Sequence, residues 1–211
     1  MKKVLATLFG AGLVLAAVAA EINVAADNWE LPKGWQLEAG KIKLTGSTVS
    51  TSLIAMLKDK TVAAAPAEFS AAVKITGQTP NEKAWRTVGL VLGPDSKNYF
   101  QLALIEPPPS GNEKRFVELK QMKDGKWGSG AGLPKSEYRQ YFRWENDQTY
   151  TLKLTVGSRE IAGVVTDEAG KDVVTLTIPV SDAAQAVSTG IPMLRASGIV
   201  GEIGNLKMET K

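Results

Sequence analysis

Residues 86–105 read RTVGLVLGPDSKNYFQLALI, and this stretch decides the fold. Apolar side chains recur at every second position over 88–92 and again over 100–104. Between the two runs stands Gly93-Pro94-Asp95, three residue types that favour turns. A period of two is typical of a β-strand that buries one face. The stretch therefore predicts two β-strands joined by a turn.

The same signals continue along most of the chain after residue 34. Short apolar or alternating runs are separated by turn residues at spacings of about ten residues. We expect strands at 35–38, 41–45, 51–57, 68–76, 86–92, 99–105, 115–122, 150–156, 161–166, 173–178 and 198–208. The segment 128–144 is expected to be irregular, and a single helical turn is expected at 181–187. The pattern predicts an all-β protein, a sandwich or barrel, in one domain.

Residues 1–20 have the three zones of a secretory signal peptide. Two lysines are followed by an uncharged apolar run over 4–18 and then by small residues. A run of this length approaches the roughly 20 residues that span a bilayer, so a retained membrane anchor is the alternative. We expect cleavage after Ala19 or Ala20. The product would be a single exported domain of residues 21–211, periplasmic or extracellular.

The chain contains neither cysteine nor histidine. Without cysteine, an exported fold of this size depends on its core rather than on disulfides. Without histidine, Ser-His-Asp hydrolysis, histidine general bases and the usual zinc sites are excluded. We expect no cofactor, with an oxygen-ligated structural calcium left open. The turn aspartates that could hold calcium lack the spacing of a calcium loop; they are Asp95, Asp124, Asp147 and Asp167.

The charge balance excludes another class of partner. The formal charge is +3, and Lys2 and Lys3 supply two of these units, so the cleaved chain carries +1. There is no long basic run, so the electrostatic footprint of a nucleic-acid-binding protein is missing. No segment after residue 20 is long and apolar enough to span a membrane. We therefore expect no nucleic-acid partner and no membrane insertion of the mature chain, while the oligomeric state stays open.

Several short patterns follow one another in a recognisable order. They are WQLEAGKI from Trp35, AEFSAAVKI from Ala67, VGLVL from Val88, NYFQL from Asn98, FVELK from Phe116, YTLKLTV from Tyr150 and GEIGNLKM from Gly201. This order resembles the concanavalin A-like lectin/glucanase jelly roll, especially the exported domains grouped as 3-keto-disaccharide hydrolase-like or laminin G-like. The resemblance covers most of residues 29–209. It implies a jelly-roll β-sandwich of two antiparallel sheets.

The chain departs from this family in two places. The last strand of the family usually carries an aromatic-Asp-Asn sequence, whereas Ile203 and Gly204 precede Asn205 here. No segment matches the Glu-x-Asp-x-x-Glu pattern of the glucanase branch. The resemblance therefore implies a carbohydrate-binding protein, a lectin rather than a glucanase.

In this resemblance, the outward face of one sheet lines a ligand groove, and the period of two names the side chains on it. The residues expected to face the core are Val88, Leu90, Leu102, Leu104, Val117 and Leu119. The expected ligand-binding residues are Arg86, Tyr99, Gln101, Glu118, Lys120 and Trp127, with Phe116 on the same face. Such a mixture suits sugars, whose C–H surfaces pack on rings and whose hydroxyls pair with amides and carboxylates. The alternative is a solvated sheet face with scattered aromatics.

Five aromatic residues crowd positions 127–144, which include the segment expected to be irregular. They are Trp127, Tyr138, Tyr141, Phe142 and Trp144. Such a group forms either a lid over the groove or a packed loop with a small core of its own. We expect Phe142 and Trp144 to belong to the core. We also expect Trp29 and Trp35 to hold the first strands against it.

Three functions fit the sequence. The first is carbohydrate binding without catalysis. The second is a glycoside hydrolase or polysaccharide lyase. A hydrolase needs two carboxyl groups about 5–10 Å apart, and the candidates are Glu118 with Glu106, Glu137 or Glu145; a lyase could use Tyr99 or Tyr141 with Arg86 or Lys120. The third is a structural or adhesive protein of the cell envelope. The sequence itself shows no catalytic constellation.

Overall fold

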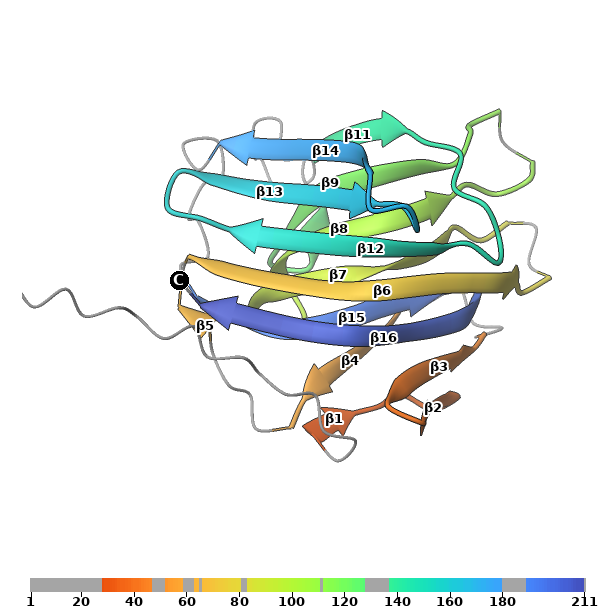
Figure 1. The fold of residues 1–211 in the computed structure, drawn as a ribbon, viewed down its shortest axis with the longest axis horizontal. Helices are drawn as coiled ribbons and strands as arrows, with labels where there is room; N and C mark the ends of the chain where they lie inside the picture. Colours follow the sequence, from red (N-terminus) through yellow and green to blue (C-terminus); the bar gives the residue numbers. More distant parts are fainter. Residues whose placement is uncertain are drawn as a thin grey trace, which may run out of the picture.

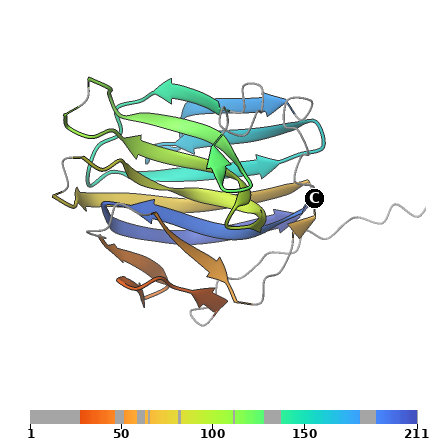
Figure 2. The ribbon, with the colours of Figure 1, turned by 180° about the vertical axis from the view of Figure 1, so that it is seen from behind.

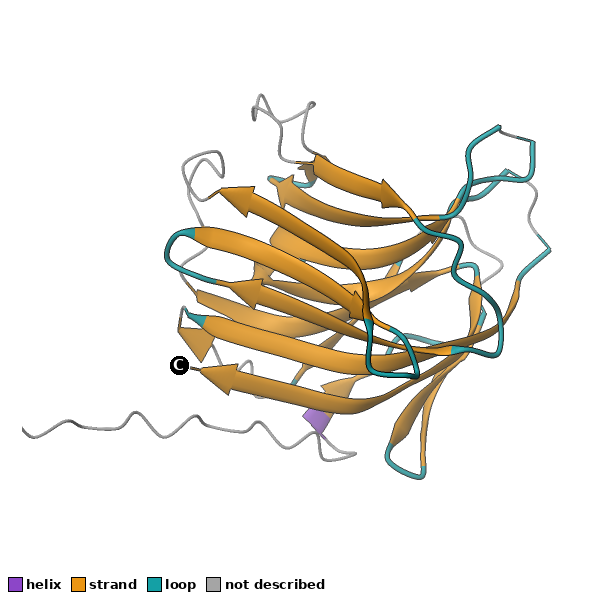
Figure 3. Cartoon of the chain, turned by 45° about the horizontal axis from the view of Figure 1, so that its top comes forward, coloured by secondary structure: helices purple, strands orange, loops and turns teal. Residues whose placement is uncertain are grey.

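A computed structural model describes residues 28–46, 52–58, 63–64, 66–80, 83–110, 112–127, 137–179 and 189–210. Strands make up most of these residues, as Figure 3 shows. The expected signal peptide, 1–20, and the helical turn expected at 181–187 lie outside the described ranges. Within those ranges, no helix has the length and apolar character needed to cross a lipid bilayer.

The described strands form two antiparallel sheets that pack face to face. Sheet A has the order β1-β4-β15-β7-β8-β9-β10, with β5 beside β15 and β11 beside β9. Sheet B has the order β14-β13-β12-β6-β16-β3-β2. Figure 1 shows sheet B in front of sheet A, and Figure 2 shows the molecule from behind, with sheet A nearer the viewer. The expected all-β sandwich of two antiparallel sheets is confirmed.

The strands of sheet A are β1 (Trp29–Glu30), β4 (Leu53–Leu57), β5 (Ala63–Ala64), β7 (Arg86–Asp95), β8 (Asn98–Glu106), β9 (Phe116–Lys123), β10 (Lys126–Trp127), β11 (Glu137–Tyr141) and β15 (Thr189–Ser197). The strands of sheet B are β2 (Trp35–Glu38), β3 (Lys41–Thr45), β6 (Ala67–Gln78), β12 (Thr149–Val156), β13 (Glu160–Thr166), β14 (Asp172–Pro179) and β16 (Ile199–Thr210). All the strands expected from the sequence are present, several of them longer than expected.

The β7–β8 hairpin lies at the centre of sheet A. Its register places Leu90 opposite Leu102. β7 continues through the Gly-Pro-Asp sequence to Asp95, where the sequence predicted a break, and a register shift accommodates the extra residues. The carboxylate of Asp95 then accepts hydrogen bonds from the backbone N–H groups of Lys97 and Asn98 at 2.7 and 2.9 Å. The strand thus ends at Asp95, three residues after Leu92, where the apolar pattern ends.

Five of the described strands, β1, β5, β10, β11 and β15, were not among the expected ones, and the two longest of them are β11 and β15. β11 lies inside the segment expected to be irregular and pairs with β9. β15 had no counterpart among the expected strands, although it pairs with β4 and β7. Pro192 lies within β15 at a position where pairing with β5 has ended, at Gly190, and pairing with β4 has not begun, at Met193. The missing N–H of this proline therefore costs no ladder hydrogen bond on that side of the strand.

The hydrophobic core fills the space between the two sheets. All six residues expected to face it are buried there: Val88, Leu90, Leu102, Leu104, Val117 and Leu119. Trp29, Trp35 and Trp144 are also buried in this core and Phe142 packs against it, as expected. The layers approach closely, because a Cβ atom added to Gly163 of sheet B would lie 2.6 Å from a methyl carbon of Leu102.

A surface ion pair joins β16 to β3 and predicts a pH dependence of stability. The Lys41 ammonium donates a hydrogen bond of 2.5 Å to Glu202, and this contact holds the pKa of the Glu202 carboxyl below its ordinary 4.5. Such a carboxyl stabilises the fold while it is ionised, so this contribution is present above pH 4.5 and is lost as the pH falls through the lower pKa of the folded state. We expect Glu202→Gln to flatten the acid side of the stability curve, measured by urea unfolding from about pH 6 to about pH 3. Parallel curves for the two proteins would contradict this assignment.

Candidate functional site

The outer face of sheet A, which points away from sheet B, is organised in rows. Directly opposed residues of antiparallel strands share a face, so side chains of neighbouring strands lie side by side. One row crosses the sheet through Ile54, Arg195, Gly89, Ala103, Glu118 and Arg139. Gly89 and Ala103 carry nothing larger than a methyl group. The middle of this row is therefore low, and it leaves space for long side chains to lie across it.

A chain of polar contacts occupies this low middle. Arg195 donates hydrogen bonds to Gln101 Oε1 at 2.5 Å and to Ser52 Oγ at 2.6 Å. Gln101 in turn donates from Nε2 to Glu118 Oε1 at 2.6 Å. The second oxygen of Glu118 lies 3.9 Å from the Lys120 ammonium. The partners fix the orientation of the glutamine amide, because a guanidinium only donates and a carboxylate only accepts.

Trp127 on β10 packs over one end of this polar chain. Its ring centroid lies 5.1 Å from the Lys120 nitrogen and 5.0 Å from the Arg195 guanidinium carbon, both within cation–π range. The buried Tyr99 ring meets Trp127 edge-on at 5.8 Å. Trp127 is thus a fixed wall of the site, held by two cations and an aromatic ring.

Trp85 and Arg139 form the opposite wall. Trp85 immediately precedes β7, is 47% exposed, and meets the buried Phe116 ring edge-on at 6.2 Å. The Arg139 guanidinium lies 4.7 Å from the centroid of the same Phe116 ring. Phe116 therefore anchors both side chains, while nearly half of the Trp85 surface stays open to solvent.

Between these walls is a hollow of about 490 Å³, the sheet A hollow. Its volume falls within the roughly 300–1,000 Å³ of typical small-ligand sites. The described residues that line it include Trp85, Phe116 and Trp127, the hydroxyl side chains of Ser52, Thr87 and Ser197, and the charged Lys83, Glu118, Lys120, Arg139 and Arg195. Aromatic, hydroxyl and charged groups thus converge on one depression.

Burial changes the ionisation of two groups beneath the hollow. Burial raises the pKa of the Tyr99 phenol, opposed by the nearby Arg195 charge, so the phenol stays protonated at neutral pH. Burial lowers the pKa of the Arg195 guanidinium, while Tyr99 and Glu118 act in the opposite direction. An arginine starts from a pKa so high that it remains a cation at neutral pH. The site therefore holds a partly buried positive charge beside a neutral phenol.

No known protein-family model and no curated protein sequence matches this chain. Solved structures do match. The winged bean acidic lectin in complex with methyl-α-D-galactose aligns with a TM-score of 0.63 and 11% identity, over 91% of this chain and 98% of that chain. The carbohydrate-binding module CBM66 from Bacillus subtilis gives a TM-score of 0.57 and 12% identity, over 87% of this chain and 96% of that chain. The chain has their jelly-roll fold.

The exoplasmic/lumenal domain of VIP36, in its Ca²⁺/Man2-bound form, is a further match. It has a TM-score of 0.64 and 12% identity, over 87% of this chain and 81% of that chain. At such low identity the likeness is one of fold. The jelly-roll β-sandwich of two antiparallel sheets that the sequence resemblance implied is thus present in the structure.

The jelly roll brings three of the six expected ligand-binding residues to the sheet A hollow. Glu118, Lys120 and Trp127 line it. Tyr99 and Gln101 lie on the expected face but are only 1% and 0% exposed, so they support the lining side chains from below. The period of two thus assigned Tyr99 and Gln101 to the correct face of the sheet. The expectation that they are accessible to a ligand is wrong, because both side chains are buried.

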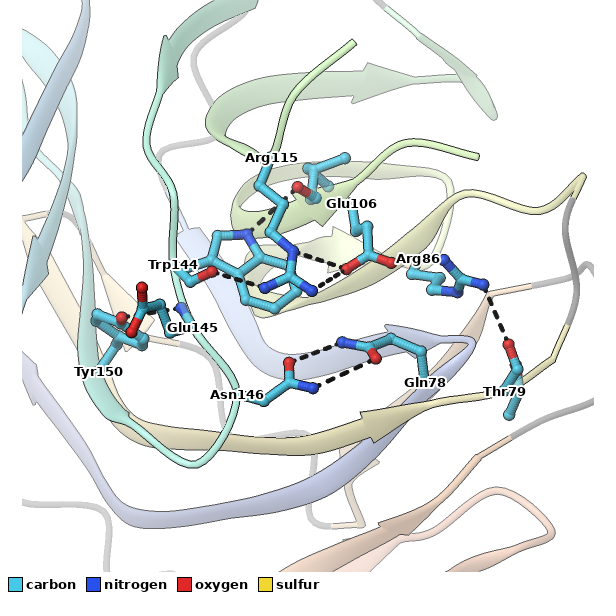
Figure 4. Close-up of polar contacts among 10 residues, drawn as sticks. Gln78, Thr79, Arg86, Glu106, Arg115, Trp144, Glu145, Asn146 and Tyr150 are labelled. Atoms are coloured by element: carbon cyan, nitrogen blue, oxygen red, sulfur yellow. Dashed lines mark hydrogen bonds and ion pairs between the residues drawn. The ribbon is translucent and has the colours of Figure 1, made fainter. Parts of the chain in front are cut away.

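Arg86 requires a correction, because the structure does not place it beside the hollow. It has the parity of Val88 on β7 and therefore points to the core side, where Glu106 binds it at 2.5 Å. Arg115 binds the other oxygen of Glu106 at 2.6 Å and stacks on the Trp144 ring at 4.0 Å. Figure 4 shows Glu106 between the two arginines, with Trp144 beneath Arg115. The role of Arg86 in this structure is to tie β7 to β8.

The hollow also uses residues that sequence reasoning missed: Ser52, Lys83, Trp85, Arg139 and Arg195. Arg195 belongs to β15 and Arg139 to β11, two of the strands that the sequence did not predict. A usable signal existed for Trp85, a large aromatic placed one residue before an expected strand. The other side chains gave no comparable signal, because surface cations and serines are common on any soluble sheet.

The acids considered for catalysis do not converge on the hollow. Glu118 is the only carboxylate among the described side chains that line it. Glu106 is held by two arginines and Glu145 lies on the exposed loop before β12, while the side chain of Glu137 is outside the described part. The carboxylates of Asp95 and Asp167 accept N–H groups of their own turns. In the described ranges, no group of three or more potential metal-ligating side chains occurs.

Proposed function

We propose that this protein is an exported carbohydrate-binding protein that holds its ligand in the sheet A hollow and has no catalytic role. The observation that carries the proposal is the Trp85 ring, 47% exposed at the rim of a polar depression. An indole face covers the C–H surface of a sugar ring and removes both from water. The fold supports the proposal, because the matched structures are a lectin in complex with a galactoside and a carbohydrate-binding module.

The polar lining supplies partners for sugar hydroxyls. Thr87 and Ser197 lie opposite each other on neighbouring strands, and each hydroxyl both donates and accepts. Glu118 offers acceptor oxygens and Lys120 offers donors at one side of the hollow. Because Gln101 and Lys120 hold Glu118 from below, its carboxylate is oriented before any ligand arrives. Such preorganisation lowers the entropic cost of binding.

A binding role fits the site better than the two catalytic alternatives. Hydrolysis of a glycoside needs two carboxyl groups on either side of the bond, and the described lining contains only Glu118. A lyase based on Tyr99 would need an accessible phenol that gives up its proton readily, whereas this phenol is buried and its pKa is raised. We therefore assign the hollow to binding.

The cellular setting is part of the same proposal. The signal-like residues 1–20 would direct the chain to the periplasm or the extracellular space, leaving residues 21–211 as one working domain. Glycans are abundant in both places. Membership in the exported 3-keto-disaccharide hydrolase-like group stays a prediction from the sequence resemblance.

Trp85→Ala tests the site directly. We expect this variant to lose about tenfold or more in affinity for any glycan that the wild-type chain retains on an array or in affinity electrophoresis, because a stacked ring contributes roughly 1 kcal/mol beyond its buried area. The control is Tyr141→Ala. Tyr141 is 63% exposed and also packs edge-on against Phe116, but it does not line the hollow.

Three results would contradict the proposal. If no glycan binds the wild-type chain, the carbohydrate role fails. Equal losses in Trp85→Ala and Tyr141→Ala would move the site away from the hollow. Release of reducing sugar or unsaturated product by the purified chain would overturn the non-catalytic part, and self-association without sugar would favour a structural or adhesive role.

A further inference from the structure

The lining of the sheet A hollow is strongly unbalanced in charge. Lys83, Lys120, Arg139 and Arg195 contribute four positive charges among the described lining residues, and Glu118 contributes the one negative charge. The whole chain, by contrast, has 25 basic and 22 acidic side chains. The excess of positive charge is thus concentrated at the point where the ligand is proposed to bind.

The negative charge of Glu118 is already engaged within the protein. Gln101 donates to one of its oxygens, and Lys120 approaches the other to 3.9 Å. Arg195 does not pair with this carboxylate directly, because the amide of Gln101 stands between them. Both hydrogen-bond acceptors of Arg195 are neutral groups, Gln101 Oε1 and Ser52 Oγ. The fold therefore orients the positive charge of Arg195, and no carboxylate of the described residues pairs with it directly.

The wall of the hollow opposite Trp127 also carries basic side chains, and these are exposed. Arg139 lies over Phe116 with 39% of its side chain exposed, and it forms an ion pair with Glu113, which lies 3.8 Å away and is itself 45% exposed. A loose surface pair of this kind contributes little and exchanges readily for a better partner. Lys83 lines the same side beside Trp85. Cations thus flank the exposed indole on which a sugar ring would stack.

We infer that the ligand of the sheet A hollow is an acidic glycan, one whose sugars carry carboxylate or sulfate groups. This inference rests on the proposed function and narrows its ligand class. Trp85 packs on the sugar ring, while Lys83 and Arg139 bind its anionic group, the arginine through two parallel N–H donors. Arg195 adds a favourable potential from within the lining, where its partial burial limits screening by salt. A neutral sugar would gain the stacking and the hydroxyl bonds alone.

The ligand test compares glycans that differ in charge and share a backbone. Polygalacturonate is paired with its fully methyl-esterified form, and dextran sulfate is paired with dextran, using the full mature chain in affinity electrophoresis and calorimetry. We expect at least one acidic member to bind about tenfold or more tightly than its neutral partner. The two pairs separate carboxylate from sulfate recognition. Affinity for the acidic member should fall several-fold between about 0.05 and about 0.5 M salt.

The variant test removes charge on one wall. Arg139→Gln and Lys83→Gln should each reduce acidic-glycan affinity by about threefold to tenfold, a larger loss than the same variant causes for the neutral partner. Lys171→Gln is the matched control. It removes one exposed positive charge in the turn before β14, in sheet B. Thermal unfolding of each variant checks that the fold is retained.

The outcomes separate the two proposals. If neutral and acidic members bind equally well, or if the charge variants weaken both alike, the acidic-glycan inference is overturned and the carbohydrate role stands. If no glycan binds, both fail. If a single-stranded DNA oligonucleotide of similar charge binds as tightly as the acidic glycan, the hollow recognises polyanions in general and the inference is again overturned.

Discussion

Gln101→Leu is expected to lower the free energy of unfolding by about 3 kcal/mol, because a buried hydrogen bond to a charged group contributes roughly 1.5–3 kcal/mol and Gln101 makes two of them. Leucine has a similar volume, so the substitution removes polarity with little change in packing. It would leave Arg195 without its 2.5 Å acceptor and Glu118 without its 2.6 Å donor. Urea unfolding measures the loss, and the acidic-glycan titration should show the accompanying loss of affinity.

A double-mutant cycle identifies the cause of this destabilisation. If the cost arises from unsatisfied charge at Arg195, then Gln101→Leu should cost much less in an Arg195→Met background, since removing both partners of a buried polar pair can be nearly neutral. A cost that is the same in both backgrounds would refute Arg195 as the origin and leave the lost donor of Glu118 as the source. Gln101→Glu is expected to destabilise as well, because it places a second carboxylate beside Glu118.

Trp144→Ala is expected to lower the free energy of unfolding by about 4 kcal/mol, in the middle of the range for truncation of a buried aromatic. The ring is 0% exposed, donates from its indole nitrogen to the carbonyl of Ile105, and carries the Arg115 guanidinium on its face. Figure 4 shows these contacts together with the Glu106 ion pairs. Removal of the ring would leave a cavity and release Arg115, one of the two partners of Glu106.

Trp144→Phe serves as the comparison for this prediction. It keeps most of the buried area and a face for Arg115, so we expect a smaller loss, about 1–2 kcal/mol. The Tyr141→Ala variant provides a surface reference and should change stability by less than about 1 kcal/mol. A Trp144→Ala protein as stable as Tyr141→Ala would show that this corner does not contribute to the core.

The sequence predicted the fold well where one face of a strand is apolar and the other is polar. The β7–β8 hairpin and the β12–β13–β14 succession follow that pattern, and their strands were found near the expected bounds. β11 was not predicted, because it pairs only with β9 at the edge of the sheet and its sequence, EYRQY, has no apolar alternation. β15 was not predicted, because a proline such as Pro192 argues against a central strand. The proline fits here because pairing with β5 ends at Gly190 and pairing with β4 begins at Met193.

The sequence could predict the site residues whose position follows from the alternation of side chains along a single strand. The period of two placed Glu118 and Lys120 on the correct face, and the same rule, applied consistently, puts Arg86 with Val88 on the core side. Arg139 and Arg195 were out of reach, since they are 56 positions apart in sequence and meet the site only through the pairing of β11 with β9 and β15 with β7. Long-range register of this kind is a property of the assembled sheet.

The position of the last two strands bears on how the chain reaches its native state. β15 lies between β4 and β7 in sheet A, and β16 lies between β3 and β6 in sheet B. In each sheet, therefore, a strand near the end of the chain connects two strands that come much earlier in the sequence. A chain emerging from the ribosome cannot close either sheet until those residues are available, and contacts of such long sequence separation form slowly. In the export route proposed above, the chain would cross the membrane as an extended polypeptide, and the late pairing of β15 and β16 would delay the folding that competes with translocation.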